Sequence, residues 1–179
     1  LDCCALLAAA DFTRRRVIDV GSGAGFPGLP LKIASPGMDI TLLDSLGKRT
    51  DFLRSAERLL GLEGVTVVCA RAEEAPPELR EGFDIAVSRA VARLNVLCEL
   101  CLPFVRPGGL FIAMKGPDCD EELAEARGAI RELGGGEARI VPYAVPGTEL
   151  RHAAVIIEKS APTPAAYPRR WAKISKKPL

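Results

Sequence analysis

Short apolar runs alternate with amphipathic stretches along most of the chain. Apolar runs bounded by Gly, Pro or Asp predict β-strands, whereas apolar residues spaced three or four apart predict helices. The pattern predicts strands over residues 17–20, 39–43, 65–69, 83–87, 110–114, 138–145 and 152–158. It predicts helices over residues 29–34, 49–60, 91–102 and 120–133.

The order of these elements predicts the fold class. Strands and helices alternate as far as the helix at 120–133, and two consecutive strands then follow. Such an order predicts an α/β fold with a mainly parallel, seven-stranded sheet and helices on both faces. The helix at 49–60 is expected to pack through an apolar face that consists of Phe52, Leu53, Ala56, Leu59 and Leu60.

A glycine-rich turn follows the first predicted strand. The segment VIDVGSGAGFPG spans residues 17–28, and a helical pattern continues from it. Glycines let the backbone turn with positive φ, and they let a ligand approach without meeting a Cβ atom. A strand, such a turn and a helix in this order commonly bind a nucleotide-like ligand.

Two ligands compete for this turn. Gly23, Gly25 and Gly28 form a G-x-G-x-x-G pattern, which is typical of NAD(P) sites in oxidoreductases. Read from Asp19, the segment is D-x-G-x-G-x-G and includes Gly21. A carboxylate there repels a pyrophosphate and attracts the ammonium and sulfonium groups of S-adenosylmethionine (SAM). We favour SAM, since the chain also lacks a Tyr-x-x-x-Lys pair; a turn without a ligand is the third alternative.

Acidic residues follow the next two predicted strands. Asp44 ends the second strand, where a carboxylate can accept hydrogen bonds from both hydroxyls of a ribose. A turn or helix-capping role is the alternative for Asp44. Glu73 follows Ala72 after the third strand and is placed to orient an adenine, although a solvated loop glutamate would give the same pattern.

The fourth predicted strand ends in Ser88-Arg89-Ala90. Enzymes that methylate exocyclic amines usually have an Asn/Asp-Pro-Pro-aromatic element there, and this chain has none. A substrate atom with a free lone pair, such as guanine N7, is therefore expected, and its methylation needs alignment rather than a general base. Arg89 and Lys115 are candidates for positioning a phosphate or a cofactor carboxylate, with surface cations as the alternative. We expect His152 to be structural.

The net charge of +1 is unevenly distributed. We divide the chain into a cofactor-binding domain at 1–159 and a linker with a basic tail at 160–179. Cations bind phosphates and aromatic rings stack on bases, so the tail suits RNA, with a solvated C-terminus as the alternative. Its predicted RNA contacts are Arg169, Arg170, Trp171, Lys173, Lys176 and Lys177. We expect removal of residues 167–179 to weaken RNA binding and to leave SAM binding intact.

The six cysteines do not form the framework of a small secreted protein. Cys98 and Cys101 have C-x-x-C spacing, but a single such pair with a distant His152 does not indicate zinc. Both cysteines are expected to be buried on one helix face. No apolar run is long enough to cross a bilayer, and no signal peptide is visible. These features predict a cytoplasmic protein without a metal or a membrane partner.

Over nearly all of its length the chain resembles the RsmG (GidB) family of bacterial 16S rRNA guanine-N7 methyltransferases, and six segments carry the resemblance. They are VIDVGSGAGFPGLPLKIA at 17–34, TLLDSLGKRTDFLR at 41–54, AVSRAVA at 86–92, MKG at 114–116, RHAAVIIEK at 151–159 and YPRRWAKISKKPL at 167–179. The resemblance implies a class I SAM-dependent methyltransferase (Rossmann-like) fold, in which the last strand is antiparallel. It also implies methylation of a guanine N7 in 16S rRNA of the small ribosomal subunit.

The resemblance also implies site residues. By position, the family's SAM contacts match Gly21, Phe26, Ala72, Glu73 and Arg89, and Asp44 matches the usual ribose acid. Family members have an N-terminal helical segment before the first strand, and residues 1–6 resemble its end. The tail has Trp171-Ala172-Lys173 where relatives often have a Gly/Pro-type stretch. A non-catalytic RNA-binding protein that keeps the fold is the remaining alternative.

Overall fold

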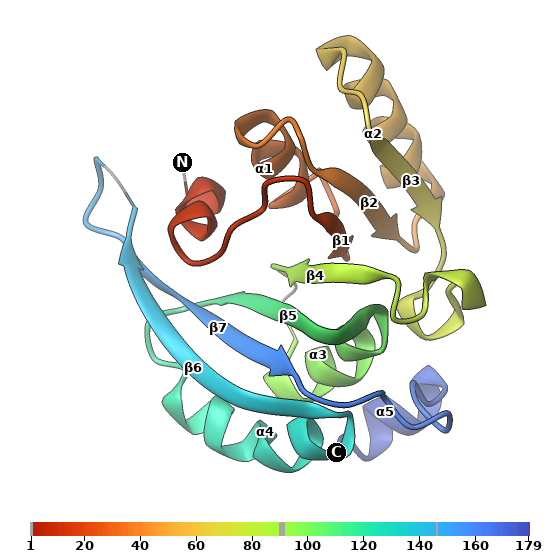
Figure 1. Ribbon diagram of the computed structural model, residues 1–179, viewed down its shortest axis with the longest axis vertical. Helices are drawn as coiled ribbons and strands as arrows, with labels where there is room; N and C mark the ends of the chain where they lie inside the picture. The colour runs from red at the N-terminus through yellow and green to blue at the C-terminus, as the bar shows by residue number, and fades with distance from the viewer. Residues whose placement is uncertain (1, 90–91, 146) are drawn as a thin grey trace.

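The computed structural model describes residues 2–89, 92–145 and 147–179, and its strands form one sheet with helices on both faces (Figure 1). The strands are β1 (Arg16–Val20), β2 (Asp39–Asp44), β3 (Val65–Cys69), β4 (Phe83–Ser88), β5 (Val105–Lys115), β6 (Gly135–Ala144) and β7 (Arg151–Lys159). The α-helices are α1 (Gly28–Ala34), α2 (Gly47–Leu60), α3 (Leu94–Cys101), α4 (Asp120–Glu132) and α5 (Trp171–Lys176). Short 3-10 helices are η1 (Asp2–Ala8), η2 (Ala72–Glu74), η3 (Pro77–Leu79) and η4 (Leu102–Phe104).

The strand order places a ligand site at the middle of the sheet. The order is β3-β2-β1-β4-β5-β7-β6, and β7 is antiparallel to both of its neighbours. The chain moves outward from β1 to β3 and then returns to β4 on the other side of β1, so the winding reverses between β1 and β4. Ligands of open α/β sheets bind at the carboxyl ends of the strands at such a point. The predicted fold class is confirmed, including the antiparallel last strand.

Both faces of the sheet are apolar because alternate side chains of its central strands point to opposite sides. Ile18 and Val20 of β1 pack with the layer that contains α3 and α4. Val17 packs with the layer that contains η1 and α1. The buried sheet therefore holds the carboxyl ends of β1, β2 and β4 at fixed positions.

The apolar face predicted for α2 is only partly buried. Leu53 is buried, but Phe52, Leu59 and Leu60 are exposed, and Leu59 is 86% exposed. The helix lies over β2 and the edge strand β3, so the sheet beneath it covers only a narrow stripe of its surface. Helical periodicity identified the helix but overestimated the width of its buried face.

Several predicted boundaries differ from the structure. The predicted helix start at Val91 lies outside the described residues, and α3 begins at Leu94. The strand predicted at 110–114 begins earlier in the structure, because β5 also includes residues 105–109. There the register against β4 shifts between Phe83 and Ile85, so the extra residues of β5 are accommodated as an irregularity of the strand.

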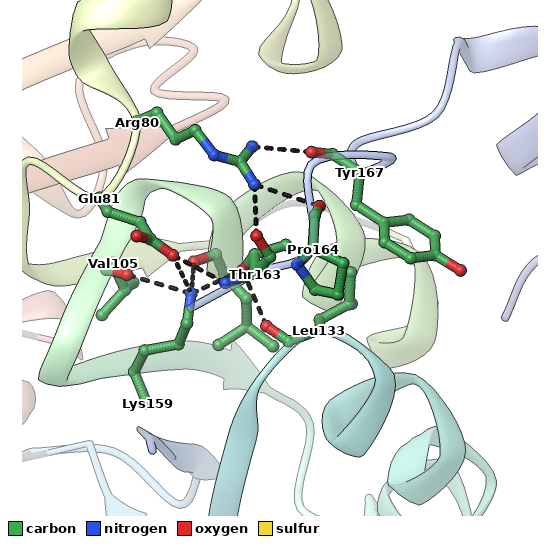
Figure 2. A network of polar contacts seen from close by, with 9 residues as sticks. Arg80, Glu81, Val105, Leu133, Lys159, Thr163, Pro164 and Tyr167 are labelled. Carbon is green, nitrogen blue, oxygen red and sulfur yellow. Dashed lines mark hydrogen bonds and ion pairs between the residues drawn. The ribbon is translucent and has the colours of Figure 1, made fainter. Parts of the chain in front are cut away.

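Residues 160–179 pack against the rest of the molecule (Figure 2). The buried Lys159 donates a hydrogen bond to the hydroxyl of Thr163 at 2.6 Å. Arg80 donates to the carbonyl oxygens of Thr163 and Tyr167 at 2.6 and 2.7 Å. The segment that leads to α5 is thus anchored at several points, while the division of the chain after residue 159 stays a prediction.

The cysteines are all free, and Cys98 and Cys101 are fully buried on α3 as predicted. Burial raises the pKa of the Cys98 thiol well above its usual range. No helix within the described residues has the length and apolar character needed to span a membrane. Within the same residues, no group of three or more His, Cys, Asp or Glu side chains is arranged to hold a metal ion.

Candidate functional site

The glycine loop turns back over the ends of β1 and β2. Gly21, Gly23 and Gly25 have φ angles of +78°, +56° and +92°, in the region that glycine adopts most readily. The N–H of Gly21 donates to the carbonyl oxygen of Leu43 at 2.8 Å, which ties the loop to β2. The backbone conformation therefore explains the first three of the four glycines of the predicted turn.

Asp19 lies beneath this loop and is fully buried. Its Oδ2 accepts the N–H of Gly28 at 2.9 Å, and its Oδ1 has no hydrogen-bond partner among the described residues. A Cβ atom at Gly28 would lie 2.7 Å from that Oδ2, so the contact requires glycine. Burial raises the pKa of Asp19 to about 7, although the Gly28 hydrogen bond acts in the opposite direction. A cation held nearby would favour its ionised form.

Asp44 joins the loop to the end of β2. Its Oδ2 accepts the N–H of Gly23 at 2.9 Å, and its Oδ1 accepts the N–H of Leu46 at 3.0 Å. The guanidinium of Arg49 lies 3.4 Å from Oδ2. Asp44 therefore stabilises the turns on both sides of it, which was the alternative role considered for it. It also lines a cavity.

That cavity has a volume of about 210 Å³ and opens beside the ends of β1, β2 and β4; we call it the β2-side cavity. It brings together four predicted cofactor residues, namely Gly21, Asp44, Ala72 and Glu73. Asp19 does not line it, so the charge of Asp19 would act from beneath the loop. Leu97 and Leu100 of α3 form an apolar wall that the motifs did not indicate.

Glu73 is the unsatisfied acid of the β2-side cavity. Its side chain is 4% exposed, and its Oε1 forms an ion pair with the guanidinium of Arg71 at 3.6 Å, a separation longer than a hydrogen bond. Its Oε1 has no hydrogen-bond partner among the described residues. A buried carboxylate oxygen without a donor is costly, so the site suits a ligand that brings an N–H or O–H group.

A second cavity of about 480 Å³ lies beside the end of β5; we call it the β5-side cavity. Arg89 lines it, whereas the preceding Ser88 lines the β2-side cavity, so the end of β4 joins the two. The Arg89 guanidinium lies 5.1 Å from the ring centre of Phe26. Phe26 and Arg89, both predicted cofactor contacts, are therefore in contact, although Phe26 is not among the residues that line either cavity.

Lys115 also lines the β5-side cavity, but its charge is already paired. Its Nζ donates to Glu122 at 2.7 Å and to the carbonyl oxygen of Ala92 at 2.6 Å, and the side chain is only 10% exposed. The Arg89 guanidinium also has a partner, since it lies 3.8 Å from Oδ2 of Asp2, but its side chain is 45% exposed. Of the two predicted positioning cations, Arg89 is therefore the more accessible to a ligand.

A polar cluster of Asp2, Tyr143 and His152 lines the β5-side cavity, and none of the three was among the predicted site residues. Asp2 Oδ1 lies 2.9 Å from His152 Nδ1 and accepts the Tyr143 hydroxyl at 3.1 Å. Tyr143 and His152 are opposite each other on β6 and β7. Only the pairing of these strands and the position of η1 bring the three together, and no sequence motif indicated this cluster.

The predicted RNA contacts of the tail fall into two groups. Arg169 is directed inward, and its guanidinium donates to Glu99 at 2.8 and 2.6 Å. Trp171 lines the β2-side cavity. The other four side chains are exposed, namely Arg170, Lys173, Lys176 and Lys177.

The strand order, the glycine loop and the acids at the ends of β1 and β2 define a class I methyltransferase fold. The structure of a predicted O-methyltransferase from Agrobacterium tumefaciens superposes with a TM-score of 0.72 at 19% sequence identity, and the match covers 90% of this chain and 82% of that protein's chain. A structure titled M. jannaschii TYW2 in complex with AdoMet matches 88% of this chain and 74% of its own, with a TM-score of 0.69 at 13% identity.

The chain belongs to the GidB family, described as rRNA small subunit methyltransferase G, whose model matches residues 1–146. A ribosomal RNA small subunit methyltransferase G from Clostridium perfringens is 47% identical over 182 aligned residues, which cover 100% of this chain and 76% of the relative. A protein of the same name from Alkaliphilus metalliredigens is 50% identical, and the alignment covers 91% of this chain and 69% of the relative. The predicted family is confirmed, and it is a family of methyltransferases.

Proposed function

We propose that the protein transfers a methyl group from SAM to N7 of a guanine in 16S rRNA of the small ribosomal subunit. The observation that supports this most directly is the β2-side cavity, where Asp44 and the unsatisfied Glu73 lie at the switch point of a methyltransferase fold. Family membership supports rRNA as the substrate. Such a substrate implies a cytoplasmic protein.

The residues present fit SAM. Glu73 Oε1 lacks a donor, which the exocyclic amine of an adenine would supply. Asp44 lines the same cavity, and its carboxylate oxygens, which each accept one backbone N–H, would also accept hydrogen bonds from the ribose hydroxyls. Asp19 adds negative charge beneath the loop, and its Oδ1 is unpartnered among the described residues. When bound, the cofactor supplies an electrophilic methyl group on a cationic sulfur.

The β5-side cavity is the place proposed for the guanine, since it adjoins the β2-side cavity at the end of β4. Arg89 lines this cavity, lies over Phe26 and can hold the cofactor carboxylate or an RNA phosphate. Guanine N7 has a lone pair in the plane of the ring and loses no proton on methylation. The protein therefore has to align the two reactants and exclude water, and no side chain has to act as a base.

Labelled methyl transfer tests this proposal. The protein is incubated with SAM that has a tritiated methyl group and with small subunits from a strain that lacks the modification. We expect label in 16S rRNA at one guanine. Treatment with borohydride and then aniline should cleave the RNA strand at that guanine, because this treatment cleaves RNA at N7-methylguanine. Label at a position resistant to that cleavage would contradict N7 as the acceptor.

The two alternative functions predict different outcomes. Binding of small subunits without any methyl transfer would favour a non-catalytic RNA-binding protein. Calorimetric binding of NADH, with none for SAM, would favour an oxidoreductase. Naked 16S rRNA, tested beside assembled subunits, identifies the form of the substrate.

A further inference from the structure

Trp171 is the first residue of α5, and it lines the β2-side cavity together with Asp44 and Glu73. We propose that Trp171 belongs to the cofactor site and contacts the adenosine moiety of SAM, an inference that rests on the proposed function. The indole is 43% exposed, which leaves part of its surface free for a ligand. The C-terminal segment would then complete the cofactor site rather than serve RNA alone.

The chemistry of the cavity favours a flat aromatic ligand beside this indole. Leu97 and Leu100 supply an apolar wall, and the acids Asp44 and Glu73 lie at the polar side. Adenosine has the same division, with an apolar ring face and hydroxyl and amine donors. Aromatic side chains stack on bases with a stabilisation of about 1–3 kcal/mol per base. At about 210 Å³, the cavity is smaller than the roughly 300–1,000 Å³ of complete small-molecule sites, so it fits one moiety of the cofactor.

A buried ion pair two residues before Trp171 attaches this part of the backbone to α3. Arg169 donates three hydrogen bonds to Glu99, one from its backbone N–H at 2.8 Å and two from its guanidinium at 2.8 and 2.6 Å. The Glu99 side chain is 1% exposed and lies on α3, the helix that also presents Leu97 and Leu100. Ile174 of α5 is fully buried, which gives the helix a second attachment. The backbone at Trp171 is therefore held in a defined place relative to the opposite wall.

This arrangement replaces the expectation that removal of residues 167–179 leaves SAM binding intact. Truncation would remove one wall of the β2-side cavity and would leave Glu99 buried without its cation. Lys173 and Lys176 are exposed on the same helix as Trp171. One short helix would thus contribute to both cofactor and RNA binding.

Tryptophan fluorescence tests the proposal directly, because Trp171 is the single tryptophan of the chain. The unmodified protein is titrated with SAM, S-adenosylhomocysteine and adenosine, and the same titrations are followed by calorimetry. We expect a saturable change in emission whose midpoint agrees with the calorimetric Kd for each ligand. Calorimetric binding of SAM without any change in emission would overturn the contact.

Two variants and a control complete the test. Trp171→Ala should weaken SAM and adenosine binding roughly tenfold, whereas Trp171→Phe should stay close to the unmodified protein. Leu59→Ala, at an exposed apolar side chain on α2, should bind SAM unchanged. Unchanged SAM affinity in Trp171→Ala would overturn this inference and leave the proposed function intact. Failure of the unmodified protein to bind SAM would overturn both.

Discussion

At the residue scale, the position of Asp19 explains why a carboxylate follows two apolar residues of β1. It is buried beneath the glycine loop, holds the N–H of Gly28 and has one oxygen without a partner among the described residues. A neutral side chain of the same shape could hold the loop, so the charge itself needs a reason. The proposed cofactor supplies one, because its sulfur and its amino group are cationic.

Asp19→Asn separates the two tasks of this side chain. Asparagine retains an oxygen that can accept from Gly28, but it lacks the charge. We expect SAM to bind roughly tenfold more weakly, since a cation loses an ionic partner in a partly dry site. S-Adenosylhomocysteine, whose sulfur is neutral, should lose less affinity. Calorimetry with both ligands checks this, and an equal loss for the two would mean that Asp19 only supports the loop.

The raised pKa of Asp19 also predicts a pH dependence of stability. Its pKa is about 7 in the folded protein against an ordinary value of 3.8, so the folded protein keeps a proton that the unfolded chain releases between these values. Retention of this proton stabilises the folded protein. The resulting contribution to the free energy of unfolding is fully present below pH 3.8 and is lost as the pH rises through about 7. Urea unfolding of the unmodified protein and of Asp19→Asn, at about pH 5 and about pH 8, measures it. The stability of the unmodified protein relative to Asp19→Asn should fall at the higher pH, and a constant difference would contradict the raised pKa.

At the scale of elements, α5 depends on a contact with α3 more than on its own sequence. It spans only Trp171–Lys176, which is too short for a stable isolated helix. The Glu99–Arg169 ion pair and the burial of Ile174 hold it in place. The guanidinium of Arg169, which was predicted from the sequence to contact RNA, thus forms an ion pair within the protein.

Arg169→Ala should therefore be strongly destabilising. It leaves the carboxylate of Glu99 buried without its cation and, among the described residues, with only the backbone N–H of residue 169 as a donor. Removal of one member of a buried ion pair typically costs about 3–5 kcal/mol. The surface pair Arg54–Asp51, with side chains 42% and 77% exposed, provides the control. Arg54→Ala should change the free energy of unfolding by less than about 1 kcal/mol. Urea unfolding of the unmodified protein and of the two variants measures these changes. Similar losses of unfolding free energy in both variants would show that the Glu99–Arg169 pair is not a main attachment of α5.

At the scale of the whole molecule, the docked C-terminal segment places exposed cations at one side of the cofactor site. Arg170, Lys173, Lys176 and Lys177 are exposed, whereas Arg169 is not free to bind phosphate. Protein cations that neutralise RNA phosphates release counterions, so each one contributes to the salt dependence of binding. The tail therefore has a testable electrostatic role that does not require its removal.

Replacement of these four exposed cations by glutamine should weaken binding to small subunits and reduce its salt dependence. The slope of log K against log salt should fall by about 0.7–0.9 for each phosphate that the variant no longer neutralises. SAM affinity should not change, because Trp171 and Arg169 remain in place. Arg127→Gln, at an exposed position of α4, is the control, and filter binding over a series of salt concentrations is the measurement. An unchanged slope in the fourfold variant would exclude the tail from RNA binding.

By itself, the sequence determined the order of the strands and of the helices up to α4, the family and the glycine turn, because these depend on local periodicity and on residues close together in the chain. It did not predict α5. Its motifs also identified Asp44 and Glu73, which each follow a strand closely. Tertiary structure decided the rest. It buried Asp19, paired Lys115 with Glu122 and Arg169 with Glu99, exposed one side of α2, and brought Trp171 to the cavity of Asp44. These outcomes depend on which distant segments pack together, and a charge or an aromatic ring in the sequence does not reveal the partner that the fold will provide.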